Sequence, residues 1–445
     1  MFSLAIRSVA HRPGRLIATL LSAFLGSVII MSFNSMHDTA AGKNIDGRSG
    51  DTLTIAASVV GGYGTLLVFF AIASTLTVNV RQRSEEISLL RRTGATPAQI
   101  KLMIVVESGV VAVVGMLLAI VPARIGGEQL LDIFKETDQV AEGVDFVFGP
   151  IALAAGVSVG LIASIGASFL AVRRATKAAA GGPQARGRGR NIGGLIAFVV
   201  GLGGIGATFS FKKTDAALMA APAYGAILIS VGFAVFSPVL LRFLLGKLAR
   251  PITAVTGASG YLTVHNMRQR ATQLSSVLMP LILFVGMASV TLYMQSIQND
   301  ALDASGVVRS VDDKSIETLN FVVVGIIVVF SCIMLINTLY AATTYRTREF
   351  GQQRLAGATP GQVLGMVAVE SLVLTVTGVF FGTVAALAGA VPFSLVRVDA
   401  VLPDQGPGIW LAIVGIGAAA TIVTSVATAH RALRTPAVEA VSLAA

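Results

Sequence analysis

Charge is scarce in this sequence, and the scarcity excludes most soluble classes of protein. Only 13% of the 445 residues are charged, while 54% are hydrophobic. About a quarter of the residues of an ordinary soluble domain are charged. Because a charge at the centre of a membrane helix costs about 2.5 to 3.5 kcal/mol on insertion scales, membrane-crossing segments are expected to lack charge. The composition therefore predicts a protein that crosses the membrane many times.

Residues that carry metal, redox or nucleotide chemistry are also few. The chain has one cysteine, Cys332, and four histidines without metal-ligand spacing. It contains no Gly-x-x-x-x-Gly-Lys-Ser/Thr phosphate-binding loop. A Gly-x-Gly-x-x-Gly match at 201–206 lies inside an apolar run, where helix packing explains it better than dinucleotide binding. We therefore expect no catalytic residue, metal or cofactor site in this chain.

Long apolar runs are present instead. Ten of them approach or exceed the roughly 18 to 20 residues that a helix needs to cross the hydrocarbon. We predict an all-α polytopic membrane protein with about ten transmembrane helices. The runs lie at residues 16–33, 52–80, 102–122, 148–172, 192–211, 216–241, 271–298, 318–345, 363–396 and 409–429.

Basic residues gather in alternate connections between these runs. If the N-terminus is cytoplasmic, the inner connections hold most of the 33 Lys and Arg residues, and this bias sets membrane orientation. We predict a multi-pass protein of the cell (plasma) membrane with both termini in the cytoplasm. The net charge of +10 and the basic run at 186–190 are explained by contact with anionic membrane lipid. We expect no nucleic-acid partner.

An internal repeat divides the chain. The phrase GATPAQIKLMIVVES, which begins at Gly94, recurs as GATPGQVLGMVAVES, which begins at Gly357. Each copy occupies the same place in a four-span half, which predicts two parallel, pseudo-equivalent repeats in a 4+2+4 arrangement. The predicted organisation is a first four-span repeat at 1–177, a basic cytoplasmic linker at 178–190, two connecting transmembrane helices at 191–250 and a second four-span repeat at 251–445.

The repeated phrase predicts a helix, a stop, a sharp turn and a second helix. Gly94 suits the left-handed position that ends a helix. Thr96 is a predicted N-cap, Pro97 the first helical residue, and Gln99 completes a capping box. Caps stabilise a helix by about 1 kcal/mol each, so we expect a rigid protrusion on the cytoplasmic face; an ordinary tight connection is the alternative. The second copy repeats the arrangement with Gly357, Thr359, Pro360 and Gln362.

Two glutamates lie within predicted spans at equivalent positions. Glu107 and Glu370 come about three helical turns after the proline of each turn. A carboxylate at membrane depth is a functional candidate. Because both lie toward the cytoplasmic end, we expect each to pair with an arginine of a neighbouring helix and to link the turn to the bundle. Proton or substrate handling is the alternative.

Both halves resemble the FtsX-like permeases, the membrane subunits of the MacB-type ABC transporter superfamily. The resemblance rests on the segments from Ser74 to Ser108 and from Asn337 to Ser371, and on RTPAVEAV at Arg434 to Val441, which is similar to a Pro-Ala-x-Glu-Ala ending common in the family. It implies that each turn inserts into a dimeric cytoplasmic ATPase. The residues that it assigns to ATPase coupling are Arg83, Glu86, Gly94, Thr96, Pro97, Arg346, Glu349, Gly357, Thr359 and Pro360, which Gln99 and Gln362 join through the capping boxes.

The resemblance also implies the partners. ATP and Mg would be bound by the separate ATPase subunit, membrane lipid would surround the spans, and an amphipathic drug, peptide or lipid-like substrate would be exported. The sequence departs from the family pattern in two ways. A short polar connection at 34–51 replaces the large extracellular domain of many members, and REFGQQRL in the second copy replaces EEISLLRR, which predicts unequal docking sites.

The leading hypothesis is therefore a permease subunit of an ABC transporter. One alternative is an ATP-driven mechanotransmitter that acts on a cell-wall hydrolase or a sensor kinase without moving a substrate. The other is an ion-coupled secondary transporter, which predicts charges near mid-span and broken helices.

Overall fold

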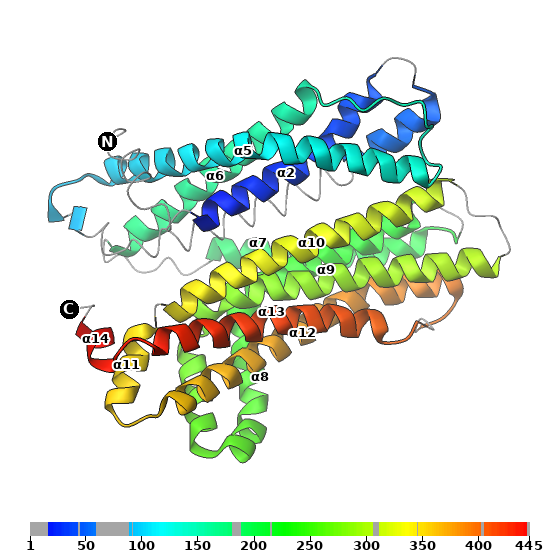
Figure 1. Ribbon diagram of the computed structural model, residues 1–445. Coiled ribbons are helices and arrows are strands. Elements are labelled where there is room, and N and C mark those ends of the chain that lie inside the picture. Colours follow the sequence, from blue (N-terminus) through cyan, green and yellow to red (C-terminus); the bar gives the residue numbers. More distant parts are fainter. Residues whose placement is uncertain are drawn as a thin grey trace. The chain divides into compact units, whose positions relative to one another are not determined.

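The computed structural model describes nine stretches of the chain (Figure 1). All of the regular structure within them is helical, and no strand occurs among them. The prediction of an all-α membrane protein is confirmed. The described residues are 17–42, 45–58, 89–90, 92–179, 188–213, 216–305, 311–344, 346–401 and 405–442.

Seven helices of these described stretches are long and apolar enough to cross a membrane. The second predicted span, 52–80, falls mostly outside them, and the fourth and eighth contain shorter apolar stretches at 150–166 and 327–340. The number ten therefore stays a prediction. The seven are Thr19–Ala40, Ala98–Glu136, Asn191–Ser210, Ala220–Pro251, Val277–Ala304, Pro360–Val398 and Gly408–Leu433.

The chain divides into two compact units. One comprises residues 1–186 with 307–330, and the other comprises 187–306 with 331–445. The long helix α10 (Val311–Thr344) contributes residues to both.

The first unit contains three packed helices, α2 (Ile17–Ala40), α5 (Pro97–Glu136) and α6 (Pro150–Ala179). Their shared core includes Met31 of α2 and Met116 of α5. A Cβ atom added at Gly156 or Gly160 of α6 would lie within 2.5 Å of these methionine side chains. The two glycines therefore allow α6 to pack closely on both neighbours, as small residues do in membrane interfaces.

The second unit is built around α9 (Ala271–Ala304), whose apolar window is 78% buried. Helices α8, α12 and α13 pack against α9, as Figure 1 shows. In α12, Gly382 brings the backbone close to Val285 of α9. The other helices of the unit are α7 (Arg188–Ala207), α8 (Ala220–Gln269), α11 (Thr347–Leu355), α12 (Pro360–Val398), α13 (Gly408–Leu433) and α14 (Ala437–Ser442), with short 3-10 turns at Thr208–Ser210 and Ala216–Met219.

Helix α8 folds back on itself (Figure 1, green). Arg268 Nη2 donates to the carbonyl oxygen of Leu245 at 3.2 Å. In a straight helix these residues would lie about 35 Å apart at 1.5 Å per residue. The chain therefore reverses direction between them, in the part of α8 that contains Pro251. This reversal brings the end of α8 and the start of α9 back to the bundle.

Candidate functional site

The second repeated turn joins α11 to α12, and its backbone conformation follows from glycine. Gly357 has a φ of 100°, in the left-handed region that side chains with a Cβ rarely adopt. The amide of Ala358 donates to the carbonyl of Gln353 at 2.9 Å, and the amide of Gly357 donates to Arg354 at 3.0 Å. The first bond spans five residues and closes the Schellman-type end of a helix.

A capping box starts α12 directly after this turn. The amide of Gln362 donates to Thr359 Oγ1 at 3.3 Å, and the amide of Thr359 donates to Gln362 Oε1 at 2.9 Å. Pro360 occupies the first turn of the helix, where its missing N–H removes nothing from the helix ladder. The end of α11 and the start of α12 are thus separated by very few residues, and hydrogen bonds fix both helix ends.

The first turn has the same construction. Gly94 has a φ of 95°, and the amide of Ala95 donates to the carbonyl of Leu90 at 2.9 Å. Thr96 and Gln99 form a capping box with the same two distances, 3.3 and 2.9 Å. The helix ends and capping boxes predicted for both copies are therefore present, whereas the role of these residues in ATPase coupling stays a prediction.

Apolar clusters support both turns. Under the first, Ile100, Met103 and Ile104 are buried together, and Leu90 and Ala95 pack against them. Under the second, the cluster is wider. It joins residues of three helices, namely Phe350 of α11, Val363 and Val367 of α12, and Ala429 and Leu433 of α13.

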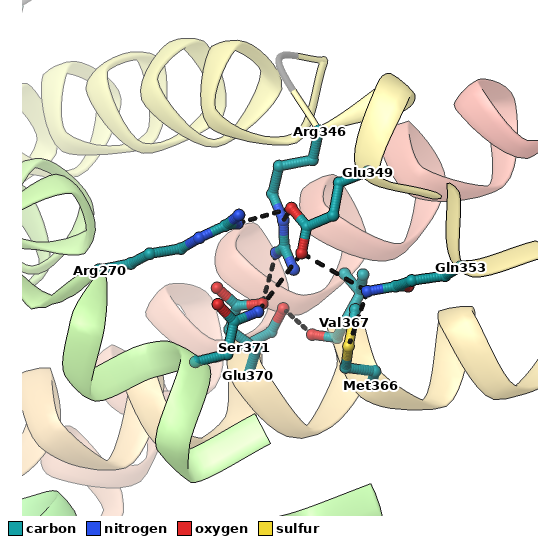
Figure 2. Close-up of polar contacts among 9 residues, drawn as sticks. Arg270, Arg346, Glu349, Gln353, Met366, Val367, Glu370 and Ser371 are labelled. Atoms are coloured by element: carbon teal, nitrogen blue, oxygen red, sulfur yellow. Dashed lines mark hydrogen bonds and ion pairs between the residues drawn. The ribbon is translucent and has the colours of Figure 1, made fainter. Parts of the chain in front are cut away.

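Arg346 lies at the start of α11 and joins two glutamates (Figure 2). Arg346 Nη1 lies 2.5 Å from Glu370 Oε2 of α12, and Arg346 Nε lies 3.2 Å from Glu349 Oε2 of α11. Its guanidinium also lies 5.2 Å from the centre of the Phe350 ring, a favourable place for a cation. The arginine partner expected for Glu370 is therefore present, and it comes from the segment that leads into the turn.

Glu349 extends this cluster to the beginning of α9. Arg270 Nη1 lies 2.7 Å from Glu349 Oε2, and Asn266 Nδ2 donates to Glu349 Oε1 at 3.4 Å. Figure 2 shows Arg270 approaching the same carboxylate as Arg346. We call Arg270, Arg346, Glu349 and Glu370 the ionic cluster. It connects the start of α9, the first turn of α11 and α12.

Glu349 and Arg346, two members of the ionic cluster that lie outside the spans, stabilise each other's charged forms. Burial disfavours the charged form of Glu349, but Arg346 and then Arg270 outweigh burial and lower the pKa of this carboxyl below its usual value. Burial likewise disfavours the Arg346 guanidinium, but Glu370 and Glu349 raise its pKa. Both groups are therefore charged at neutral pH, and they hold each other in place.

In the first half, the described residues include only some of the residues equivalent to this site. Glu107, the counterpart of Glu370, is 4% exposed, but Arg83 and Glu86 lie outside the described residues. The sequence did not identify Arg270 or Asn266 as members of the site. The signal was present in the short basic approach HNMRQRATQL before the seventh apolar run, but only the fold-back of α8 shows that it reaches Glu349.

Comparison with known families gives two matches. A family model described as FtsX-like permease C-terminal matches residues 58–180 and again residues 321–437, which together make up more than half of the chain. The chain belongs to the FtsX-like permease family. Each matched region of this permease contains one repeated turn. A comparison with curated proteins finds no match.

Membership of the family and the apolar helices support the conclusion that this chain is a multi-pass membrane protein. They also support its assignment as the permease of an ABC transporter, which works with a partner ATPase. Permeases of this kind are membrane subunits and are not usually catalytic. The two matches also agree with the two repeats identified from the sequence.

Proposed function

We propose that this permease couples ATP hydrolysis by a separate cytoplasmic ATPase dimer to the export or extraction of an amphipathic substrate, such as a drug, a peptide or a lipid-like molecule. The observation that carries the proposal is the presence of two turns with the same hydrogen bonds in one chain. Two turns with the same backbone construction suit a partner with two equivalent faces. In this proposal both turns and both termini are cytoplasmic.

Transmission of motion from the second turn is supported by the ionic cluster. If closure of the ATPase dimer displaces the turn, Arg346 and Glu349 move with it. Their ion pairs with Glu370 of α12 and Arg270 of α9 would pass that displacement to two spans. Because α12 has 39 residues, it is about 58 Å long, about twice the thickness of the hydrocarbon. It is therefore long enough to carry the motion to the opposite face.

The choice of an amphipathic substrate is supported by the apolar exterior of the second unit. Only 17% of the apolar window of α7 is buried, and Leu195, Val199 and Leu202 on that helix are exposed. Surfaces of this kind favour contact with lipid and with molecules that partition into lipid. ATP and Mg would remain in the ATPase.

The turns are tested by replacing both glycines with valine. A β-branched residue at a φ near 100° is strongly disfavoured, so Gly94→Val with Gly357→Val deforms both turns. Gly109→Val with Gly365→Val is a matched control, because a Cβ at either position meets no described atom within 4 Å and neither glycine has a positive φ. ATP hydrolysis is measured with the partner ABC ATPase in lipid nanodiscs.

We expect the unmodified permease and the control to bind the ATPase and change its rate, and the turn variant to lose the effect. Failure of the correctly folded permease to associate with the ATPase would overturn the proposal and favour an ion-coupled transporter. A normal effect on the ATPase without movement of any amphipathic substrate would favour the mechanotransmitter alternative.

A further inference from the structure

The last helix of the described residues, α14, lies beside α11 (Figure 1) and packs against its backbone at Gly351. A Cβ atom added there would lie 3.0 Å from the carbonyl oxygen of Ala437, 3.1 Å from Ala440 Cβ and 3.2 Å from Val441 Cγ2. All three separations are shorter than ordinary van der Waals contacts, so a single Cβ would require the neighbouring atoms to move by a few tenths of an ångström, and a side chain as large as leucine would separate the two helices. Glycine at 351 is therefore what allows α14 to seat on α11.

A second connection runs from Arg354, three residues before Gly357. Its Nη1 donates to the carbonyl oxygens of Leu433 at 3.1 Å and of Thr435 at 2.8 Å. Carbonyl groups at the end of a helix lack partners within the helix, and a basic side chain satisfies them well. Arg354 thus attaches α11 to the end of α13 and to the segment that leads into α14.

Helix α11 needs such support because it is short. It has nine residues, and isolated helices below about 12 residues are marginal in water. Its amino acids are mostly polar, and Phe350 is its one large apolar side chain that is buried in the described structure. Its rigidity must therefore come from contacts with other helices. The ionic cluster supports its first turn, and α14 supports its middle.

The first half differs at the positions that matter for this contact. The repeat aligns Gly351 with Ser88, and the stretch that follows α6, AGGPQARG at 180–187, has no Pro-Ala-x-Glu-Ala sequence. Both segments lie outside the described residues, so the comparison is one of sequence alone. The combination of a glycine in the short helix and a helix-forming ending occurs in the second half only.

We propose that α14 is a brace that positions the second turn for the ATPase, with Gly351 and Arg354 as its positioning residues. The inference rests on the proposed coupling function. With α14 seated, force applied at Gly357 moves α11 together with α12 and α13. With α14 displaced, α11 rocks, and the motion is absorbed before it reaches the spans.

The direct test compares Gly351→Leu with Gly365→Leu. Leucine is a good helix former, and Gly365 on α12 faces open space in the described structure, so only the change at 351 meets α14. Hydrogen exchange is measured at residues 437–442, and ATPase coupling is measured in nanodiscs with the same ATPase. For the 351 variant we expect exchange about tenfold faster at α14 and coupling reduced about fivefold or more, with the control within about twofold of the unmodified permease. A chain that ends at Pro436 provides a second variant, because it removes α14 but keeps both carbonyl acceptors of Arg354.

A reversible disulfide provides an independent test. The added Cβ at 351 and Ala440 Cβ are 3.1 Å apart, slightly below the roughly 3.5 to 4.5 Å between the Cβ atoms of disulfides, so a small shift allows the bond. Gly351→Cys with Ala440→Cys, in a Cys332→Ser background, should couple normally when oxidised and less well when reduced. Loss of coupling on oxidation would show that α14 must leave α11 during turnover and would overturn the brace.

The outcomes separate the two proposals. Faster exchange at α14 with unchanged coupling would refute the brace and leave the coupling function intact. Unchanged exchange in Gly351→Leu would show that α14 is not seated on α11, which refutes the brace as well. A well-folded, unmodified permease without any effect on the ATPase would instead remove the coupling function and, with it, the positioning role.

Discussion

The two repeated turns are made by the same bonds, but the described residues around them provide different supports. Both end a helix at a left-handed glycine and start the next one with a Thr-Gln capping box. The described support of the first turn is a compact cluster on α5 around Ile100. The second is held by a cluster that reaches α13, by the ionic cluster and by α14. The shape of a turn is thus a local property, whereas its stiffness depends on distant parts of the chain.

The largest expected effect comes from Glu370→Gln. The side chains of Arg346 and Glu370 are 13% and 9% exposed, and removing one partner of a buried ion pair costs about 3 to 5 kcal/mol. Glu349 remains beside Arg346, so we expect the free energy of unfolding to fall by an amount near the lower end of this range, about 3 kcal/mol. Unfolding of the second unit is followed through the fluorescence of the one tryptophan, Trp410, whose indole Nε1 donates to Thr383 Oγ1 of α12 at 2.8 Å.

Glu107→Gln is the matching change in the first half. From the repeat alignment we predict that Arg83 pairs with Glu107 as Arg346 pairs with Glu370, so we expect the free energy of opening measured by hydrogen exchange at 97–108 to fall by a comparable amount, about 3 kcal/mol. A much smaller loss than in Glu370→Gln would show that only the second half uses a buried ion pair. The proposed equivalence of the two carboxylates would then be wrong.

The turns themselves were predictable from sequence because they depend on neighbouring residues. Gly357, Thr359 and Gln362 determine one another's hydrogen bonds within a few positions, and the same holds for the first copy. The general pattern of spans was predictable because length and hydrophobicity determine it. An arginine partner for Glu370 was also foreseeable, since a carboxylate at that depth requires a compensating charge.

The attachment of the second turn was not predictable, because it depends on residues far apart in sequence. The region 242–270 reads as a basic connection, but in the structure it continues α8 and folds back, so that Arg268 reaches Leu245. Only this reversal brings Arg270 to Glu349. Likewise, nothing near Arg354 in sequence identifies the carbonyls of Leu433 and Thr435 as its acceptors.

A smaller effect is expected from removing the N-caps, and it tests whether the two turns are locally equal. Thr96→Ala and Thr359→Ala each remove one capping hydrogen bond of 3.3 Å, worth about 1 kcal/mol. We expect hydrogen exchange in the first turns of α5 and α12 to rise by about fivefold in each variant. Thr93→Ala, which alters a hydroxyl bonded to Leu90 outside the capping box, is the control. Faster hydrogen exchange in only one of the two variants would contradict the view that both turns are determined locally.

The smallest effect concerns the response of the ionic cluster to pH. Arg346 and Arg270 lower the pKa of Glu349 in the folded chain despite burial, so the unfolded chain binds this proton more readily. The stabilisation from Glu349 is therefore fully present above the ordinary glutamate pKa of about 4.3 and is lost as pH falls through the lower folded value. Tryptophan-monitored stability of the unmodified permease should exceed that of Glu349→Gln at pH 7, and the difference should shrink in acid. A difference that stays constant from neutral pH to strong acid would show that the carboxylate acts through packing rather than charge. The stiffness of the second turn would then depend on the Arg346–Glu370 ion pair, α14 and the apolar cluster, without a contribution from the charge of Glu349.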